Sequence, residues 1–152
     1  MNNISLKIAI DFDGTIVEHK YPAIGQPIPR AFEVIKELRR KGHYLILWTY
    51  RNGKELDDAI DFCKKNGLDF QAVNHSTKEE ASEWKFIYDK ISRKPDADVF
   101  IDDRNVGGFL GWEKIRECIL GTKEEATPIS EEDSYEQEVG KKGFFDKLFG
   151  RK

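Results

Sequence analysis

The chain has 152 residues, which suits one domain of ordinary size with a sizeable core. Its 25 basic and 28 acidic residues leave a net charge of -3, so no global basic field recruits nucleic acid or a membrane. No apolar run is long enough to span a bilayer and the N-terminus lacks the layout of a signal peptide, so we expect a cytoplasmic protein. The two cysteines, Cys63 and Cys118, lie far apart in segments with helical patterns, and we expect both to be reduced.

A short apolar run near the start of the chain, within residues 7–17, ends in Asp11 and Asp13, and Gly14 follows directly. This pattern predicts a strand that delivers acids to a sheet edge, where the chain then turns. Alternate residues of an extended segment point the same way, so the two carboxylates are expected to face one small volume. Two like charges that close repel one another unless a cation or a shared proton compensates. The alternative is a strand end that merely carries a turn-forming Asp-Gly pair.

Helices and strands alternate from there to residue 120. Residues 19–29, which are rich in proline, predict an ordered loop. The predicted helices are residues 30–41, 54–66, 77–92 and 112–120, and the further strands are residues 43–49, 69–73 and 98–103. The alternation predicts an α/β fold, a three-layer Rossmann-like parallel sheet with helices on both faces and right-handed crossovers. In such sheets the ligand site lies beyond the carboxyl ends of the strands.

The composition changes after residue 121, which we predict to end the folded domain. Residues 122–140 hold one basic residue against seven acids and are expected to form a solvated linker. Residues 141–152 reverse the sign, with five basic residues and a helical stripe of apolar ones. Such a segment is typical of docking to a membrane surface or to a partner protein, while packing on the domain and disorder are the alternatives.

Polar side chains end three of the predicted strands. Asp102 and Asp103 end the last strand, and Thr49 ends the second. These side chains are expected to meet Asp11 and Asp13 at one edge of the sheet. Hard oxygen ligands around one point make a site for Mg²⁺, which would relieve the repulsion between the carboxylates. A divalent ion beside a free carboxylate and a hydroxyl suits phosphoryl transfer.

With these motifs in place, the sequence resembles the haloacid dehalogenase superfamily of Mg²⁺-dependent phosphohydrolases over residues 8–106. The first motif is Asp11-Phe12-Asp13-Gly14-Thr15, the second is Leu47-Trp48-Thr49 and the fourth is Ile101-Asp102-Asp103. An Asp-x-Asp-Gly-Thr run after a strand is a specific signal, and the ordered companion motifs strengthen it. An acid at the position of Asp13 favours the phosphatase and phosphomutase branches of this family.

The resemblance implies a role for each of these residues. Asp11 would attack phosphorus to form an aspartyl-phosphate, and Asp13 would protonate the leaving oxygen and then activate the hydrolytic water. Thr49 would hydrogen-bond the phosphoryl group. The implied metal ligands are Asp11, Asp13 through its backbone carbonyl, Asp102 and Asp103. The implied substrate-binding residues are Gly14, Thr15, Tyr50 and Arg51.

The roles of the nearby cations stay open. The third motif of the family is a lysine, for which Lys78 and Lys94 are both candidates. Lys78 would start the helix after the third strand, on the side of the acids, whereas the segment around Lys94 resembles one found in small relatives. Arg51 is expected either to bind the substrate phosphate in a bidentate way or to form a surface salt bridge. Arg104 is expected either to brace the carboxylates or to pair at the surface.

The sequence leaves no room for the cap domain that many members of this family insert over the site. The resemblance therefore implies an open site for a phosphorylated substrate, small or macromolecular, or one closed by a neighbouring subunit in a homo-oligomer. The leading hypothesis is a Mg²⁺-dependent phosphatase that hydrolyses phosphomonoesters. The alternative is a non-catalytic binding or scaffold module docked through its C-terminal amphipathic segment.

Overall fold

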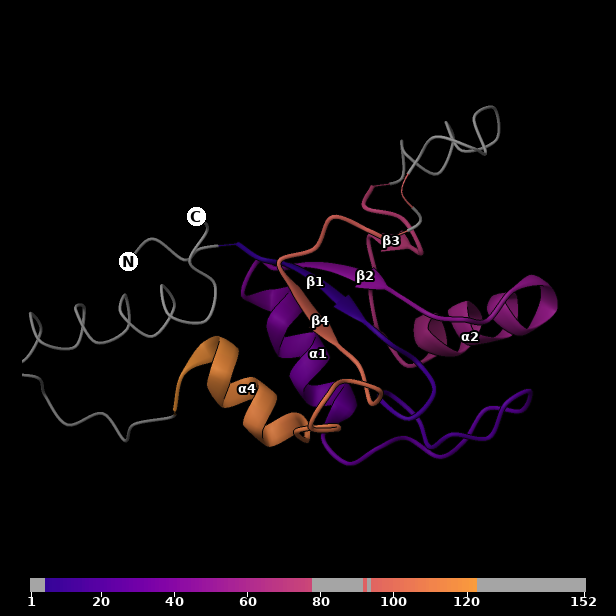
Figure 1. The fold of residues 1–152 in the computed structure, drawn as a ribbon, viewed down its shortest axis with the longest axis horizontal. Helices are drawn as coiled ribbons and strands as arrows, with labels where there is room; N and C mark the ends of the chain where they lie inside the picture. Colours follow the sequence, from indigo (N-terminus) through magenta and orange to yellow (C-terminus); the bar gives the residue numbers. More distant parts are fainter. Residues whose placement is uncertain (1–4, 78–91, 93, 123–152) are drawn as a thin grey trace, which may run out of the picture. The chain divides into compact units, whose positions relative to one another are not determined.

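The computed structural model of the protein contains a four-stranded parallel sheet with helices packed against it (Figure 1). The structure describes residues 5–77, 92 and 94–122. In chain order the elements are β1 (Lys7–Ile10), α1 (Ala31–Arg40), β2 (Tyr44–Leu47), α2 (Gly53–Lys65), β3 (Ala72–Val73), β4 (Val99–Ile101) and α4 (Trp112–Leu120). This is an α/β, Rossmann-like fold, which confirms the fold class predicted from the alternation of strands and helices.

The order of the strands identifies the edge at which a ligand site belongs. The strands lie in the order β3-β2-β1-β4, so the chain winds outward from β1 to β3 and then returns to the far side of β1. β1 and β4 therefore flank the point at which the winding reverses, which is where open α/β sheets bind ligands. Ile10 pairs with both Leu47 and Ile101 in register. The residues that directly follow these three strands consequently leave the sheet at one edge.

Successive strand residues point to opposite faces, which gives the sheet two different surfaces. On one face, Ile8 and Ile10 pack in a buried cluster with side chains of α1, α2 and α4. The helix residues of this cluster are Ala31, Val34, Ile35, Leu38, Ala59, Cys63, Trp112 and Ile115. On the other face, Ala9, Ile46 and Ala72 form a second, smaller cluster. The large cluster holds β1 against α1, α2 and α4, and so fixes the position of the residues that follow β1.

The segment between β1 and α1 is an ordered loop, as its prolines predicted. Backbone hydrogen bonds join its two arms, from the Glu18 N–H to the Gln26 carbonyl at 2.8 Å and from the Ile28 N–H to the Ile16 carbonyl at 2.9 Å. From β1 to β3 the described chain runs continuously through α1, β2 and α2, and no cap domain interrupts this stretch.

The strands are shorter than predicted. β3 begins at Ala72 rather than at residue 69, while β2 and β4 end at Leu47 and Ile101 rather than at residues 49 and 103. The polar residues that follow β2 and β4 belong to loops, because the strand ladder ends before them. The predicted helix at residues 77–92 lies outside the described residues except at its two ends. The predicted linker at 122–140 lies outside them except for residue 122, and the basic segment at 141–152 lies wholly outside them.

Cys63 and Cys118 are free thiols, as expected. Cys63 is buried in α2, and this burial raises the pKa of its thiol to about 12, so the group is an unreactive part of the core. In the described part of the chain, none of the helices combines the length and the apolar character needed to cross a membrane.

Candidate active site

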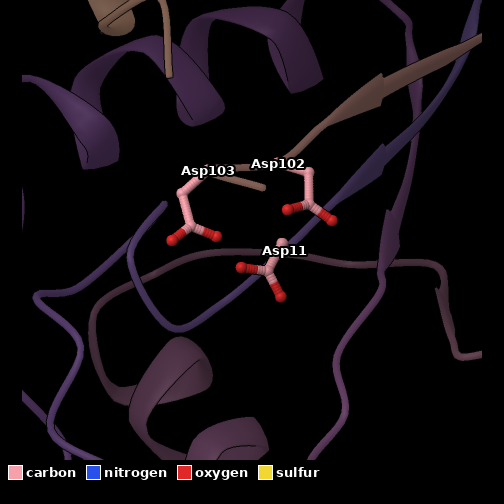
Figure 2. A group of neighbouring side chains, drawn as sticks. All are labelled: Asp11, Asp102 and Asp103. Atoms are coloured by element: carbon pink, nitrogen blue, oxygen red, sulfur yellow. The ribbon is translucent and has the colours of Figure 1, made fainter. Parts of the chain in front are cut away.

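Three carboxylates meet at the edge where the winding of the sheet reverses. Asp11 directly follows β1, and Asp102 and Asp103 directly follow β4. One carboxylate oxygen from each of the three lies within 4.8 Å of the other two, and Figure 2 shows the groups gathered around one small volume. The proximity follows from the register, because Ile10 pairs with Ile101 and the Asp11 N–H donates to the Ile101 carbonyl at 2.9 Å. The predicted convergence of these acids is therefore present.

Gly14 allows Asp103 to approach the loop after β1. Its φ is +89°, a left-handed conformation that glycine adopts without strain. A Cβ atom at this position would lie 2.6 Å from Cγ of Asp103, which is closer than real contacts allow. The sequence placed Gly14 among the substrate-binding residues. In the structure Gly14 also leaves space for Asp103, which belongs with Asp11 and Asp102 to the cluster that we call the acidic group.

Thr15 is fully buried and connects three parts of the site. Its hydroxyl donates to Oδ2 of Asp11 at 3.2 Å and accepts from the Asp103 N–H at 3.1 Å. Its carbonyl accepts from Nε1 of Trp112 at 2.8 Å. A buried indole N–H needs an acceptor, but no local pattern in the sequence predicts that Thr15 provides it for Trp112. Thr15 thus braces the two acid-bearing loops against each other and against α4.

The environment of Asp11 opposes its ionisation. Burial raises the pKa of Asp11 to about 7, and the charges of Asp102 and Asp103 act in the same direction. Hydrogen bonds from the Phe12 backbone and from Thr15 act against this rise. A bound cation would reverse the balance, since it favours the ionised form of all three acids.

One carboxylate oxygen of the acidic group has no hydrogen-bond partner in the described part of the chain. Among the described residues, Oδ1 of Asp103 is buried without a hydrogen bond. A buried acceptor without a donor is costly, and an unpaired carboxylate oxygen more so. Asp11, Asp102 and Asp103 offer only hard oxygen atoms, the ligands that Mg²⁺ prefers. The donor set and the unpaired oxygen therefore fit a divalent cation of this kind.

Asp13 lies in a different environment from Asp11. Its carboxylate forms a bidentate ion pair with Arg51, with Nε to Oδ2 and Nη2 to Oδ1 both at 2.7 Å. Alternation along the strand led us to expect Asp11 and Asp13 to face one volume. In the structure the acids grouped with Asp11 are Asp102 and Asp103, while Asp13 is neutralised by a cation of its own.

Arg51 is a buried residue, with 2% of its surface exposed. Its guanidinium lies 5.1 Å from the ring centroid of Phe12 and 5.3 Å from that of Tyr21. It also donates to two loop carbonyls, from Nη1 to Pro22 at 2.9 Å and from Nη2 to Ala23 at 2.8 Å. The hydrogen bonds to Asp13 raise the pKa of Arg51, so it stays charged. The alternative of a surface salt bridge is wrong, because this ion pair is buried.

Thr49 is buried two residues beyond β2. Its N–H donates to Oδ1 of Asn74 at 2.8 Å, and its hydroxyl accepts from the Arg51 N–H at 3.2 Å. Asn74 has a φ of 54°, a left-handed conformation that asparagine tolerates better than most residues. Sequence reasoning missed Asn74, and its position directly after an apolar run was the available signal. Tyr50 is 91% exposed, so its side chain is open to solvent beside the buried Thr49.

The remaining predicted cations are Lys78, Lys94 and Arg104. Lys78 lies outside the described residues. Lys94 is exposed and precedes β4, with its ammonium 4.9 Å from the ring centroid of Phe100. The choice between these two lysines therefore stays a prediction. Arg104 contacts the acids through its backbone, since its N–H donates to Oδ1 of Asp102 at 2.8 Å.

No protein-family model and no curated protein matches the chain. Among solved structures, it is similar to a conserved protein coded by a locus from Bacteroides thetaiotaomicron. The two sequences are 49% identical over 80% of this chain and 94% of that chain, and the structures superpose with a TM-score of 0.70. At this identity and coverage, the chain belongs to the same family as that conserved Bacteroides protein.

Proposed function

We propose that the protein is a Mg²⁺-dependent phosphatase of the haloacid dehalogenase type, which hydrolyses phosphomonoesters through an aspartyl-phosphate at Asp11. The observation that carries the proposal is the acidic group formed by Asp11, Asp102 and Asp103 beyond the ends of β1 and β4. The motif Asp11-Phe12-Asp13-Gly14-Thr15, which resembles the first motif of that superfamily, supplies Asp11 of this group directly after β1.

Asp11, Asp102 and Asp103 would hold the cation. When bound, Mg²⁺ would offset negative charge on the phosphoryl oxygens and on the acids themselves. Oδ1 of Asp103, which has no partner among the residues that the structure describes, supports this assignment, because a cation would satisfy it.

Asp11 is the proposed nucleophile. The hydroxyl of Thr15 holds one of its carboxylate oxygens, which restricts the orientation of the group. In the first step a bond forms between a carboxylate oxygen and phosphorus while the ester P–O bond breaks. The leaving oxygen receives a proton from Asp13, which enters this step protonated on a carboxylate lone pair that Arg51 does not use. In the second step water attacks phosphorus, Asp13 takes its proton, and phosphate leaves as the Asp11 carboxylate is restored.

Thr49 is proposed to hydrogen-bond the phosphoryl group. Its hydroxyl already accepts from the Arg51 N–H, so its own proton remains available to donate. Lys78 and Lys94 remain the candidates for the lysine of the third motif. The phosphorylated substrate, small or macromolecular, would enter an uncapped edge of the sheet, and we propose that the reaction takes place in the cytoplasm.

Phosphate release from an aryl phosphate tests the proposal. The wild-type protein is expected to release phosphate with Mg²⁺ and to stop when a chelator is added. Asp11→Asn should abolish release, whereas Asp57→Asn should not, because Asp57 is an exposed residue of α2 outside the acidic group. Activity that survives in Asp11→Asn would contradict the mechanism. Mg²⁺ binding without turnover of any phosphomonoester would favour the alternative of a non-catalytic scaffold module.

A further inference from the structure

We infer that Arg51 is a positioning residue that holds the carboxylate of Asp13 and the loop at residues 21–23 in one fixed arrangement, and is not a substrate-binding residue. The inference rests on the proposed function in one respect, namely that Asp13 is the group that moves protons. It goes beyond the proposed function because Arg51 is taken to hold Asp13 and not to bind the substrate phosphate.

The hydrogen bonds of Arg51 leave no free fork for a phosphate. A bidentate contact needs N–H groups on two neighbouring nitrogens that point the same way. Nε donates to Asp13, while Nη2 donates both to Asp13 and to the Ala23 carbonyl. Nη1 donates to the Pro22 carbonyl. Arg51 could therefore bind a phosphate in this way only by releasing Asp13 or the loop.

The surroundings of the guanidinium also oppose such a release. Its Cζ atom lies over the ring of Phe12, which follows β1, and over the ring of Tyr21, which belongs to the loop. The Arg51 side chain is 1% exposed and that of Asp13 is 11% exposed. Opening the pair would leave two charges unpaired in a site with little water, which is strongly unfavourable. The contact is therefore a fixed part of the site.

The same guanidinium holds a loop that is otherwise exposed. Tyr21, Pro22 and Ala23 are exposed at the surface, yet two of their carbonyls accept from a buried cation. A change at Arg51 should consequently alter both the orientation of Asp13 and the mobility of this loop. Lysine cannot replace it, because an ammonium lacks the planar fork and cannot reach Asp13 and both carbonyls together.

A double-mutant cycle tests the assignment kinetically. We expect Arg51→Lys to lower kcat by about 100-fold with KM nearly unchanged, since a misplaced proton-transfer group slows the chemistry. In an Asp13→Asn background the same substitution should have little further effect on kcat. Arg39→Lys is the matched control, because Arg39 pairs with Asp69 at the surface and should keep wild-type kinetics. A rise in KM that persists in the Asp13→Asn background would overturn the inference in favour of direct phosphate binding.

Limited proteolysis tests it without any enzyme activity. Lys20 is exposed at the start of the anchored loop, so trypsin cleavage after Lys20, identified by mass spectrometry, reports on loop anchoring. Arg51→Lys keeps the number of tryptic sites and should accelerate this cleavage about tenfold, whereas Arg39→Lys should not. Asp13→Asn should accelerate it as well, and serves alone if Arg51→Lys does not fold. Unchanged cleavage in a folded variant would overturn the inference, whatever the outcome of the phosphatase assay.

Discussion

Arg51 donates to both carboxylate oxygens of Asp13 at 2.7 Å, and the pair is buried. Two residues earlier in the chain, Asp11 has no ion pair with any of the described residues and lies instead with Asp102 and Asp103. The two acids of the first motif therefore have opposite electrostatic surroundings. The proposed role of Asp11 as nucleophile therefore depends on a cation that favours its ionised form, whereas Asp13 has Arg51 as its counter-charge.

The stabilisation by Mg²⁺ should depend on pH. The pKa of Asp11 is raised to about 7, so below this pH the acid is protonated and is a poor metal ligand. We expect the increase in Tm caused by Mg²⁺ to be small at about pH 5.5 and to grow as the pH rises through 7. Asp11→Asn should remove most of this pH dependence. An increase in the Tm of the wild type that is equal at about pH 5.5 and at about pH 8 would contradict the assignment of Asp11 as a ligand.

Without metal, Asp11→Asn should stabilise the fold above neutral pH. The pKa of Asp11 is about 7 in the folded protein and 3.8 in the unfolded reference, so the folded state disfavours the ionised form. Wild-type stability is therefore complete below 3.8 and falls as the pH rises toward 7. In chelator at about pH 8, urea unfolding should show Asp11→Asn to be about 2–4 kcal/mol more stable than wild type. The two proteins should have similar free energies of unfolding near pH 3.8. A lower free energy of unfolding for Asp11→Asn at both of these pH values would argue against the raised pKa.

Gly14→Ala should disrupt the acidic group as well as the backbone. The new Cβ would overlap Asp103 and would also strain a backbone with φ +89°. We expect a loss of about 3 kcal/mol or more in the free energy of unfolding. Gly42→Ala is the matched control, since Gly42 has φ +88° with nothing near its Cβ position, and it should cost only about 1–2 kcal/mol. Equal losses in urea unfolding would mean that the approach of Asp103 to Gly14 does not matter.

Thr15→Val should weaken the connection between the two acid-bearing loops. Valine keeps the shape of threonine but neither donates to Asp11 nor accepts from the Asp103 N–H. The expected cost is about 1–3 kcal/mol, because a buried N–H loses its partner. Losing the hydrogen bond to Asp11 should also raise the pKa of that acid. The increase in Tm caused by Mg²⁺ should then begin at a higher pH. Thr15→Ser keeps the hydroxyl, so it should retain the wild-type pH dependence, and a shift as large as that of Thr15→Val would refute the role of the hydroxyl.

The meeting of the acids could be predicted from the sequence because it depends on regular structure. Asp11 and Asp102 each follow an apolar run, and parallel strands that end in register bring such residues to one edge. The predicted strands were too long by one to three residues at some ends, since periodicity does not mark where a ladder stops.

The partners of these acids could not be predicted because they depend on the paths of loops. The contact between Arg51 and Asp13 requires the loop through Tyr21 to fold back over the guanidinium, and no periodic pattern encodes this path. The bond from Trp112 to Thr15 joins residues far apart in the chain, so local sequence carries no sign of it.

Trapping the covalent intermediate tests the central claim most directly. Asp13→Asn should slow hydrolysis of the aspartyl-phosphate more than its formation with an aryl phosphate, whose leaving group needs little protonation. The reaction is run with Mg²⁺, quenched rapidly with acid and then reduced with borohydride. Mass spectrometry should find the modified residue at Asp11. The account predicts modification at Asp11 in Asp13→Asn and none in Asp11→Asn. Phosphate release with no modified Asp11, or release that continues in Asp11→Asn, would contradict it.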